Sequence, residues 1–449
     1  MQGGELLNMA WSVLGKALEK TRDAAVLVVE KDSVMTKYAE SQVSVVQRWR
    51  SFSVSLYMNR EGRVFVLGFE SPSLEEAARK VIDFTESYKI MEESEYNAPL
   101  PEPENPGVLE GCFDASIREL LEKEKERETD EPTEVIRSVI ENHVVDRFAG
   151  KVSCGVLRKA LVTSKGFEAA FEKTFFDGYI RVFKGENSGQ WAFTSTRYDK
   201  EMLRSAVEKA CCYAELKLPF TKVEPGKYKI ALSPMVAGNL FDYIADQASA
   251  MSIDMGASFL IKYKVGDKIA SEKLTLLDRP RDPLLPGVSP FDDEGLRTYD
   301  KPVIEDGVLK NILHNTKTAA KRKTKSTANA GWLTPHAWNL EVKPGDLSEE
   351  ELFSEIKKGL VITNNWYTRL QNYVEGQFST VSRDAVIVVE NGEPVALARR
   401  IRVADTFPSL LQNITGMTRN RYQIEWWEVE TPIRLPFIVV EQAGITSTD

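Results

Sequence analysis

The spacing of apolar residues predicts alternating helices and strands in the first half of the chain. Within Glu5–Lys20, apolar residues recur three and four positions apart, as on one face of a helix. A buried strand is predicted at Ala24–Glu30, which contains the aliphatic run Ala24–Val29. Apolar and polar residues alternate in Phe52–Met58, and a turn at 59–62 precedes Arg63–Phe69, which predicts a β-hairpin. Further strands are predicted at Cys154–Val162, Tyr179–Lys184 and Trp191–Thr194.

Capping patterns predict where several helices begin. Ser73-x-x-Glu76 is a capping box, and Thr133 is predicted as the N-cap of a helix with apolar residues on one side. Asn97–Gly107 contains four prolines, so this segment is predicted to be a loop. Other helices are predicted at Ser116–Glu128, Asp199–Ala214 and Val236–Ala250, and from the capping box Ser348-x-x-Glu351 to Gly359.

The pattern changes after Lys217–Gly226, where prolines and a glycine interrupt it. Beyond this segment long helices are fewer, and Asp306-Gly307 and Asn391-Gly392 each separate two apolar segments, which predicts two tight hairpins. We therefore predict an α+β protein. A mixed α/β domain at 1–217 would precede a β-rich, mostly antiparallel and barrel-like domain at 218–449.

Composition narrows the classes of protein that this chain resembles. It has 449 residues, with 58 Lys and Arg against 67 Asp and Glu, and no concentrated basic face of the kind that binds nucleic acid. No apolar run approaches the roughly 20 residues that span a bilayer. Four cysteines without a C-x-x-C pair do not suggest a disulfide framework. We expect a cytoplasmic protein that contacts neither nucleic acid nor membrane.

A search for catalytic motifs finds few candidates. The sequence has three histidines and no H-E-x-x-H pair, nucleophile elbow or P-loop. His143 lies beside an apolar helix face and is interpreted as a core or boundary residue. The cluster Asp292-Asp293-Glu294 is compatible with a hard-cation site or with a turn of solvated acids.

Two other segments leave alternatives open. The basic run Lys317–Lys325 suits either an anionic partner or a solvated loop that faces the protein's own acids. Trp366, Tyr367 and Arg369 suit either recognition of a peptide or partner, or a strand that crosses the core.

Motifs spread in order along the second half resemble those of the TldD/PmbA family. Phe291–Gly295 is similar to its D-D-E-G element, and Ile304–Leu309 to its I-E-x-G-V-L hairpin. Ser326–Asn329 is similar to its S-T-G-N element, with Ala328 in place of the usual glycine. The resemblance also includes Gly256–Asp278, Asn339–Gly345, Gly376–Ser379 and Ile387–Pro394.

Within that family the chain resembles the PmbA (TldE) branch. TldD-type subunits have an H-E-x-x-x-H helix and a later cysteine as zinc ligands, whereas Leu240–Gln247 here has neither His nor Glu and Val361–Arg369 has no Cys. The resemblance therefore implies a non-catalytic subunit of a zinc metalloprotease complex that acts on unfolded peptides, with zinc only in a TldD-like partner. It implies a hetero-oligomer or a homodimer. Peptide or partner contacts are expected from Trp366, Tyr367, Arg369 and Phe378.

Two other functions remain open from the sequence. One is a stand-alone hydrolase whose metal site, suited to Mn or Mg, is built from His314, Asp292, Asp293 and Glu294. The other is a non-proteolytic modulator or binding protein, as the family's description as gyrase modulators implies.

Overall fold

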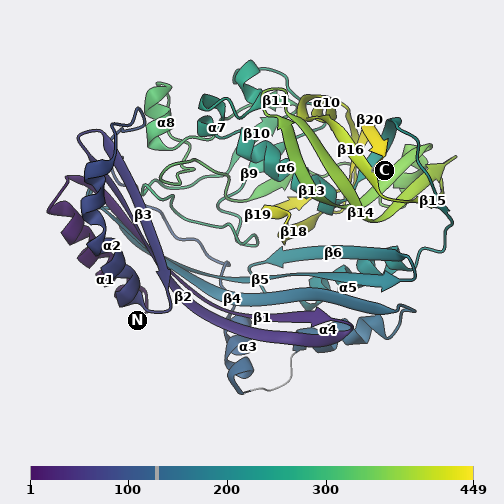
Figure 1. Ribbon diagram of the computed structural model, residues 1–449, viewed down its shortest axis with the longest axis horizontal. Coiled ribbons are helices and arrows are strands. Elements are labelled where there is room, and N and C mark those ends of the chain that lie inside the picture. The colour runs from purple at the N-terminus through teal and green to yellow at the C-terminus, as the bar shows by residue number, and fades with distance from the viewer. Residues whose placement is uncertain (1, 127–130, 448–449) are drawn as a thin grey trace.

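The first half of the chain is built around one long, curved sheet (Figure 1). The computed structural model describes residues 2–126 and 131–447. Six strands lie in the order β3-β2-β1-β4-β5-β6, and every neighbouring pair is antiparallel. Their bounds are Asp23–Ala39 (β1), Gln42–Arg60 (β2), Arg63–Ser71 (β3), Arg147–Thr163 (β4), Glu168–Lys184 (β5) and Asn187–Ser195 (β6).

Helices cover one face of this sheet because alternate residues of its strands are apolar. At one end, Val26 of β1 and Val162 of β4 pack with Leu6 of the first helix. At the other end, Val152 of β4 packs with the later helices. The helices of this half are α1 (Gln2–Leu18), α2 (Leu74–Asp83), α3 (Ala115–Glu126), α4 (Glu131–Ile140) and α5 (Lys200–Ala214), with a 3₁₀ helix at Thr85–Ile90.

The opposite face of the sheet packs against the second half, which has two further sheets. One has the order β11-β10-β9-β12-β19-β18, in which only β12 and β19 are parallel. Its strands are Leu276–Asp278 (β9), Lys301–Glu305 (β10), Val308–Leu309 (β11), Leu340–Val342 (β12), Tyr422–Trp426 (β18) and Val429–Leu435 (β19).

The third sheet is ring-like, because β13 pairs with both β8 and β14 and so closes the path β13-β8-β20-β16-β14. Its strands are Phe220–Thr221 (β7), Gly226–Leu232 (β8), Gly359–Asn372 (β13), Gln377–Glu390 (β14), Glu393–Ala398 (β15), Ile401–Thr406 (β16), Ile414–Met417 (β17) and Ile438–Ser447 (β20). The helices of this half are α6 (Pro234–Gln247), α7 (Ala250–Asp254), α8 (Thr316–Lys321), α9 (Glu351–Ile356) and α10 (Phe407–Gln412), with a 3₁₀ helix at Phe259–Lys262.

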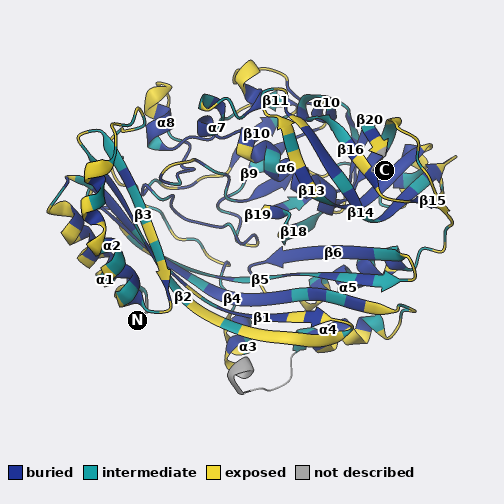
Figure 2. Ribbon diagram, viewed as in Figure 1, coloured by how far each residue is buried: buried dark blue, intermediate teal, exposed yellow. Residues whose placement is uncertain are grey.

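The two halves share one hydrophobic core (Figure 2). Trp191 of β6 stacks on Phe437, with ring centroids 6.1 Å apart, and meets the ring of Tyr422 edge-on at 5.0 Å. The predicted boundary at 217/218 falls between α5 and β7. The predicted class is confirmed: a mixed α/β half precedes a β-rich, mostly antiparallel half. Among the described residues, no helix has both the length and the apolar character needed to cross a bilayer.

Local signals predicted the turns and caps well. Asp306 and Gly307 have φ values of 49° and 78°, and Asn391 and Gly392 have 53° and 80°, as tight hairpin turns require. At the start of α2, the N–H of Glu76 donates to Ser73 Oγ at 3.2 Å.

Two local predictions were wrong. Thr133 is not an N-cap, because α4 begins at Glu131 and Thr133 lies inside its first turn. The basic run is not simply a loop, because α8 occupies its first part and the Lys317 side chain is only 2% exposed. The run faces the protein's own acids through the pairs Lys317–Glu294, Lys321–Glu95 and Arg322–Asp254.

Candidate functional site

The acidic cluster Asp292-Asp293-Glu294 lies in the loop between β9 and β10. Asp292 is buried and accepts the backbone N–H groups of Glu294 and Leu296 at 3.0 and 2.9 Å. Burial raises the pKa of Asp292, and the Glu294 carboxylate adds to the effect. Glu294 accepts Lys317 Nζ at 2.5 Å and the N–H of Thr316 at 2.8 Å. These oxygens therefore hold the loop together.

His314 lies just before α8, near the same loop. Its ring is buried, and Nδ1 is 3.1 Å from Thr318 Oγ1. Although His314 and Glu294 both border the start of α8, no group of three or more His, Cys, Asp or Glu side chains is placed to hold a metal ion within 2–126 and 131–447. The geometry gives no support to a metal site built from His314 and the acidic loop.

The four residues expected to contact a peptide or partner lie in different environments. Phe378 was wrongly included, because it is fully buried and stacks on Phe407 at 4.7 Å between ring centroids. Tyr367 is 55% exposed, and the Arg369 guanidinium lies over its ring at 4.2 Å. Trp366 is partly buried and lines a pocket of about 410 Å³.

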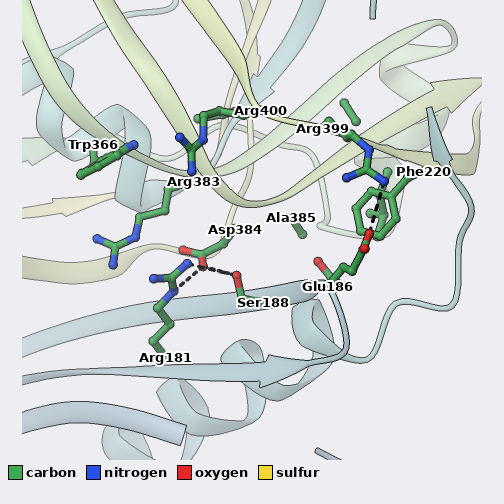
Figure 3. Close-up of a pocket in the computed structure, with 14 residues that line it drawn as sticks. Arg181, Glu186, Ser188, Phe220, Trp366, Arg383, Asp384, Ala385, Arg399 and Arg400 are labelled. Carbon is green, nitrogen blue, oxygen red and sulfur yellow. Dashed lines mark hydrogen bonds and ion pairs between the residues drawn. The ribbon is translucent and has the colours of Figure 1, made fainter. Parts of the chain in front are cut away.

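This pocket lies between the two halves of the molecule (Figure 3). The first half contributes Arg181 from β5, Glu186 from the turn after it, and Asn187 and Ser188 from the start of β6. The second half contributes Trp366 from β13, Arg383 and Asp384 from β14, and a segment after β15. Pockets at such junctions are common ligand sites. Its charged residues are Arg181, Arg383, Arg399, Arg400, Glu186 and Asp384.

Asp384 is the central acceptor in the pocket. Its carboxylate is fully buried and receives Arg181 Nε at 2.7 Å, Ser188 Oγ at 2.6 Å and Asn364 Nδ2 at 2.7 Å. The residue has a φ of 61°, a value that aspartate tolerates better than most residues. The contact with Arg181 joins β5 of the first half to β14 of the second.

Arg383 points to the other side of the pocket, toward aromatic rings. Its guanidinium lies 5.7 Å from the ring centroid of Trp366 and 5.8 Å from that of Trp427. Burial lowers the pKa of Arg383, and the positive charge of Arg181 lowers it further. The sequence analysis missed Arg383, although Arg383-Asp384 is a charged pair directly before the apolar run Ala385–Val389.

Residues 225–447 match the model of the PmbA/TldA metallopeptidase C-terminal domain. This part of the chain belongs to the PmbA/TldD family. A metalloprotease of Methanocaldococcus jannaschii is 27% identical over 200 residues, which are 43% of this chain and 44% of that protein. The metalloprotease PmbA of Escherichia coli O157:H7 is 29% identical over 201 residues, 43% of this chain and 42% of that protein. The chain thus matches less than half the length of these curated relatives.

Solved structures show the same fold over nearly the whole chain. TldE from Thermococcus kodakarensis has a TM-score of 0.82 at 18% identity, and the match covers 98% of this chain and 100% of the TldE chain. A candidate modulator of DNA gyrase from Thermotoga maritima has a TM-score of 0.81 at 20% identity, and the match covers 97% of this chain and 100% of the Thermotoga chain.

Within the PmbA/TldD domain, α6 is the helix that the resemblance aligns with the zinc helix of TldD-type subunits. Its Asp242 accepts the backbone N–H groups of Glu430 and Thr431 at 2.8 and 3.3 Å. The Asp246 side chain is exposed, but the surrounding protein removes part of its hydration, which raises its pKa to about 7. The negative charges of Asp242 and Glu430 raise this pKa further. A helix with one carboxylate engaged by backbone and no histidine does not fit a zinc centre.

Proposed function

We propose that this chain is a PmbA/TldE-type subunit that acts with a TldD-like zinc peptidase on unfolded peptides and does not itself supply the zinc site. The main support is the side-chain content of α6. A hydrolytic zinc centre needs about three protein ligands and an open coordination position. Here Asp242 is engaged in holding the chain around Glu430 and Thr431, and the three histidines of the sequence lie on other segments.

An exposed sheet edge supports association with a second chain. Residues 42–51 of β2 pair with β1 on one side, and β3 pairs only with residues 52–60 of β2. In the described part of the chain no strand covers the other side of this segment. Four of its apolar residues are between 37% and 49% exposed: Val43, Val45, Val46 and Trp49. A partner or an extended peptide can extend a sheet at such an edge.

The test measures metal content and peptidase activity of the chain alone, of a TldD-like subunit alone, and of their mixture. We expect zinc and chelator-sensitive cleavage of a flexible fluorogenic peptide in the mixture, and neither in this chain by itself. The matched control is a mixture in which the partner's zinc-ligating histidine is replaced by alanine, which should be inactive. Chelator-sensitive cleavage by this chain alone would contradict the proposal. An association without any cleavage would favour a non-proteolytic modulator.

A further inference from the structure

The pocket between the two halves has an excess of positive charge. Among the described residues that line it, four arginines accompany two carboxylates. Arg181 is paired with Asp384 at 2.7 Å, and Arg399 with Glu186 at 3.3 Å. Neither carboxylate forms an ion pair with Arg383 within the described residues. Arg400 has an interaction of its own, so Arg383 is the cation of this wall with which a negatively charged ligand would pair.

Arg383 is the group that such a ligand would satisfy. It is partly buried, and its guanidinium makes no hydrogen bond or ion pair with the described residues. It has ring contacts with Trp366 and Trp427, and the carboxylates of Asp384 and Glu428 attract it from beyond ion-pair distance. A guanidinium has five N–H donors in a fixed plane, and donors left without acceptors in a partly dry site cost free energy. A ligand with two coplanar oxygens can accept two of these donors together.

We propose that this pocket binds a ligand through a carboxylate group, with Arg383 as the principal anchor and Trp366 as an apolar wall. A carboxylate matches the guanidinium plane with two parallel hydrogen bonds. A phosphate dianion matches the site less well, because Arg181 and Arg399 are already paired with carboxylates and Arg383 would have to balance both of its charges. The volume of about 410 Å³ lies within the range of small-ligand sites and suits a few residues of a peptide.

The carboxylate has two possible sources, the C-terminus of a peptide or an acidic side chain. Three short peptides separate them: acetyl-Ala-Leu-Phe with a free carboxylate, the same peptide as its amide, and acetyl-Asp-Leu-Phe amide. Isothermal titration calorimetry on the full chain measures each affinity. We expect at least one carboxylate peptide to bind roughly tenfold or more tightly than the neutral amide. Equal affinities, or no binding of any peptide, would overturn the proposal.

Variants then test the anchor. Arg383→Gln should weaken carboxylate binding by about tenfold or more. Arg383→Lys should bind with an affinity between those of the parent and Arg383→Gln, because lysine keeps the positive charge but lacks the two parallel N–H donors of a guanidinium. Arg22→Gln, at an exposed arginine between α1 and β1, is the matched control and should bind as the parent does. Parent-like binding by Arg383→Gln would refute the assignment. If that variant fails to fold, the acid and amide peptides still decide the question on the unaltered chain.

This inference goes beyond the proposed partnership and does not depend on it. The titrations use the chain without any TldD-like subunit. A missing peptidase activity in the mixture and a missing carboxylate affinity in the isolated chain are therefore separate failures.

Discussion

Single residues show how neighbours, rather than water, hold the buried polar groups of this protein. Glu294 is satisfied by Lys317 and by the N–H of Thr316, and Asp384 by three side-chain donors. His314 is held less completely, since its ring has one hydrogen-bond contact, with Thr318. Burial lowers the pKa of His314 to about 4, with a further contribution from the positive charge of Arg322. The ring is therefore neutral in the folded protein at neutral pH.

This depressed pKa predicts acid sensitivity. Between about pH 6.5 and pH 4, the unfolded chain binds a proton at this histidine and the folded chain does not, so stability falls as the pH drops through that window. Above pH 6.5 the residue contributes no pH dependence. Urea unfolding at pH 7.5 and 4.5 should show a loss in the parent that is about 2–3 kcal/mol larger than in His314→Gln. An equal loss in both proteins would show that the histidine is not responsible.

At the scale of elements, half of β2 lies at an open edge of the sheet. Figure 2 shows its early part as an exposed band along the sheet. Natural proteins usually protect such edges with lysine, proline or a bulge, because an unpaired edge offers backbone donors and acceptors to another chain. Residues 42–51 contain one register shift, at Ser44, but four apolar residues of the segment still reach solvent, which favours a strand-mediated interface.

A charge placed on this edge should therefore weaken association. Val45→Lys adds a positive charge to the exposed edge, and we expect at least a roughly tenfold weaker complex with a TldD-like subunit, or a loss of the homodimer, by analytical ultracentrifugation. Val265→Lys is the matched control, since Val265 is 57% exposed in a loop of the second half. Parent-like association of Val45→Lys would place the interface elsewhere.

At the scale of the whole molecule, the two halves are joined by apolar packing and by a buried polar link. The packing centres on Trp191, Tyr422 and Phe437. The polar link is the ion pair Arg181–Asp384, whose carboxylate is fully buried. Removing one partner of a buried pair leaves the other charge without compensation, which costs more than the pair itself contributes.

Asp384→Asn should therefore destabilise the molecule by roughly 2–4 kcal/mol, measured by urea unfolding or calorimetry. The asparagine keeps the size of the side chain and tolerates the positive φ, so the lost charge is the main change. Glu186→Gln, which breaks the exposed pair with Arg399 in the same pocket, is the control and should change stability by about 0.5 kcal/mol or less. Equal effects of the two substitutions would show that burial of the link does not matter.

Much of the fold was predictable because its signals are local. The hairpins at Asp306-Gly307 and Asn391-Gly392 follow from residues that accept positive φ, and α2 from the cap at Ser73. Strand lengths were less predictable. The apolar run ends at Val29, yet β1 continues to Ala39, because β2 and β4 supply backbone partners on both sides of its polar part.

The candidate pocket was predicted only through Trp366. Nothing near Arg181 in the sequence indicates that its partner is Asp384, about two hundred positions away. Phe378 illustrates the converse, since it was predicted to contact a peptide or partner, and stacking on Phe407 places it in the core.

The sequence by itself determined the order of the main helices and strands of the first half, the hairpin turns, the absence of paired histidines and the family of the second half. These depend on residues within a few positions of one another, or on their types alone. Only the tertiary structure decided which strand edge stays open, which pocket arginine forms no ion pair with the described residues, and which acids hold the loop rather than a metal. Those features depend on charges and hydrogen-bond partners that folding brings together from distant segments.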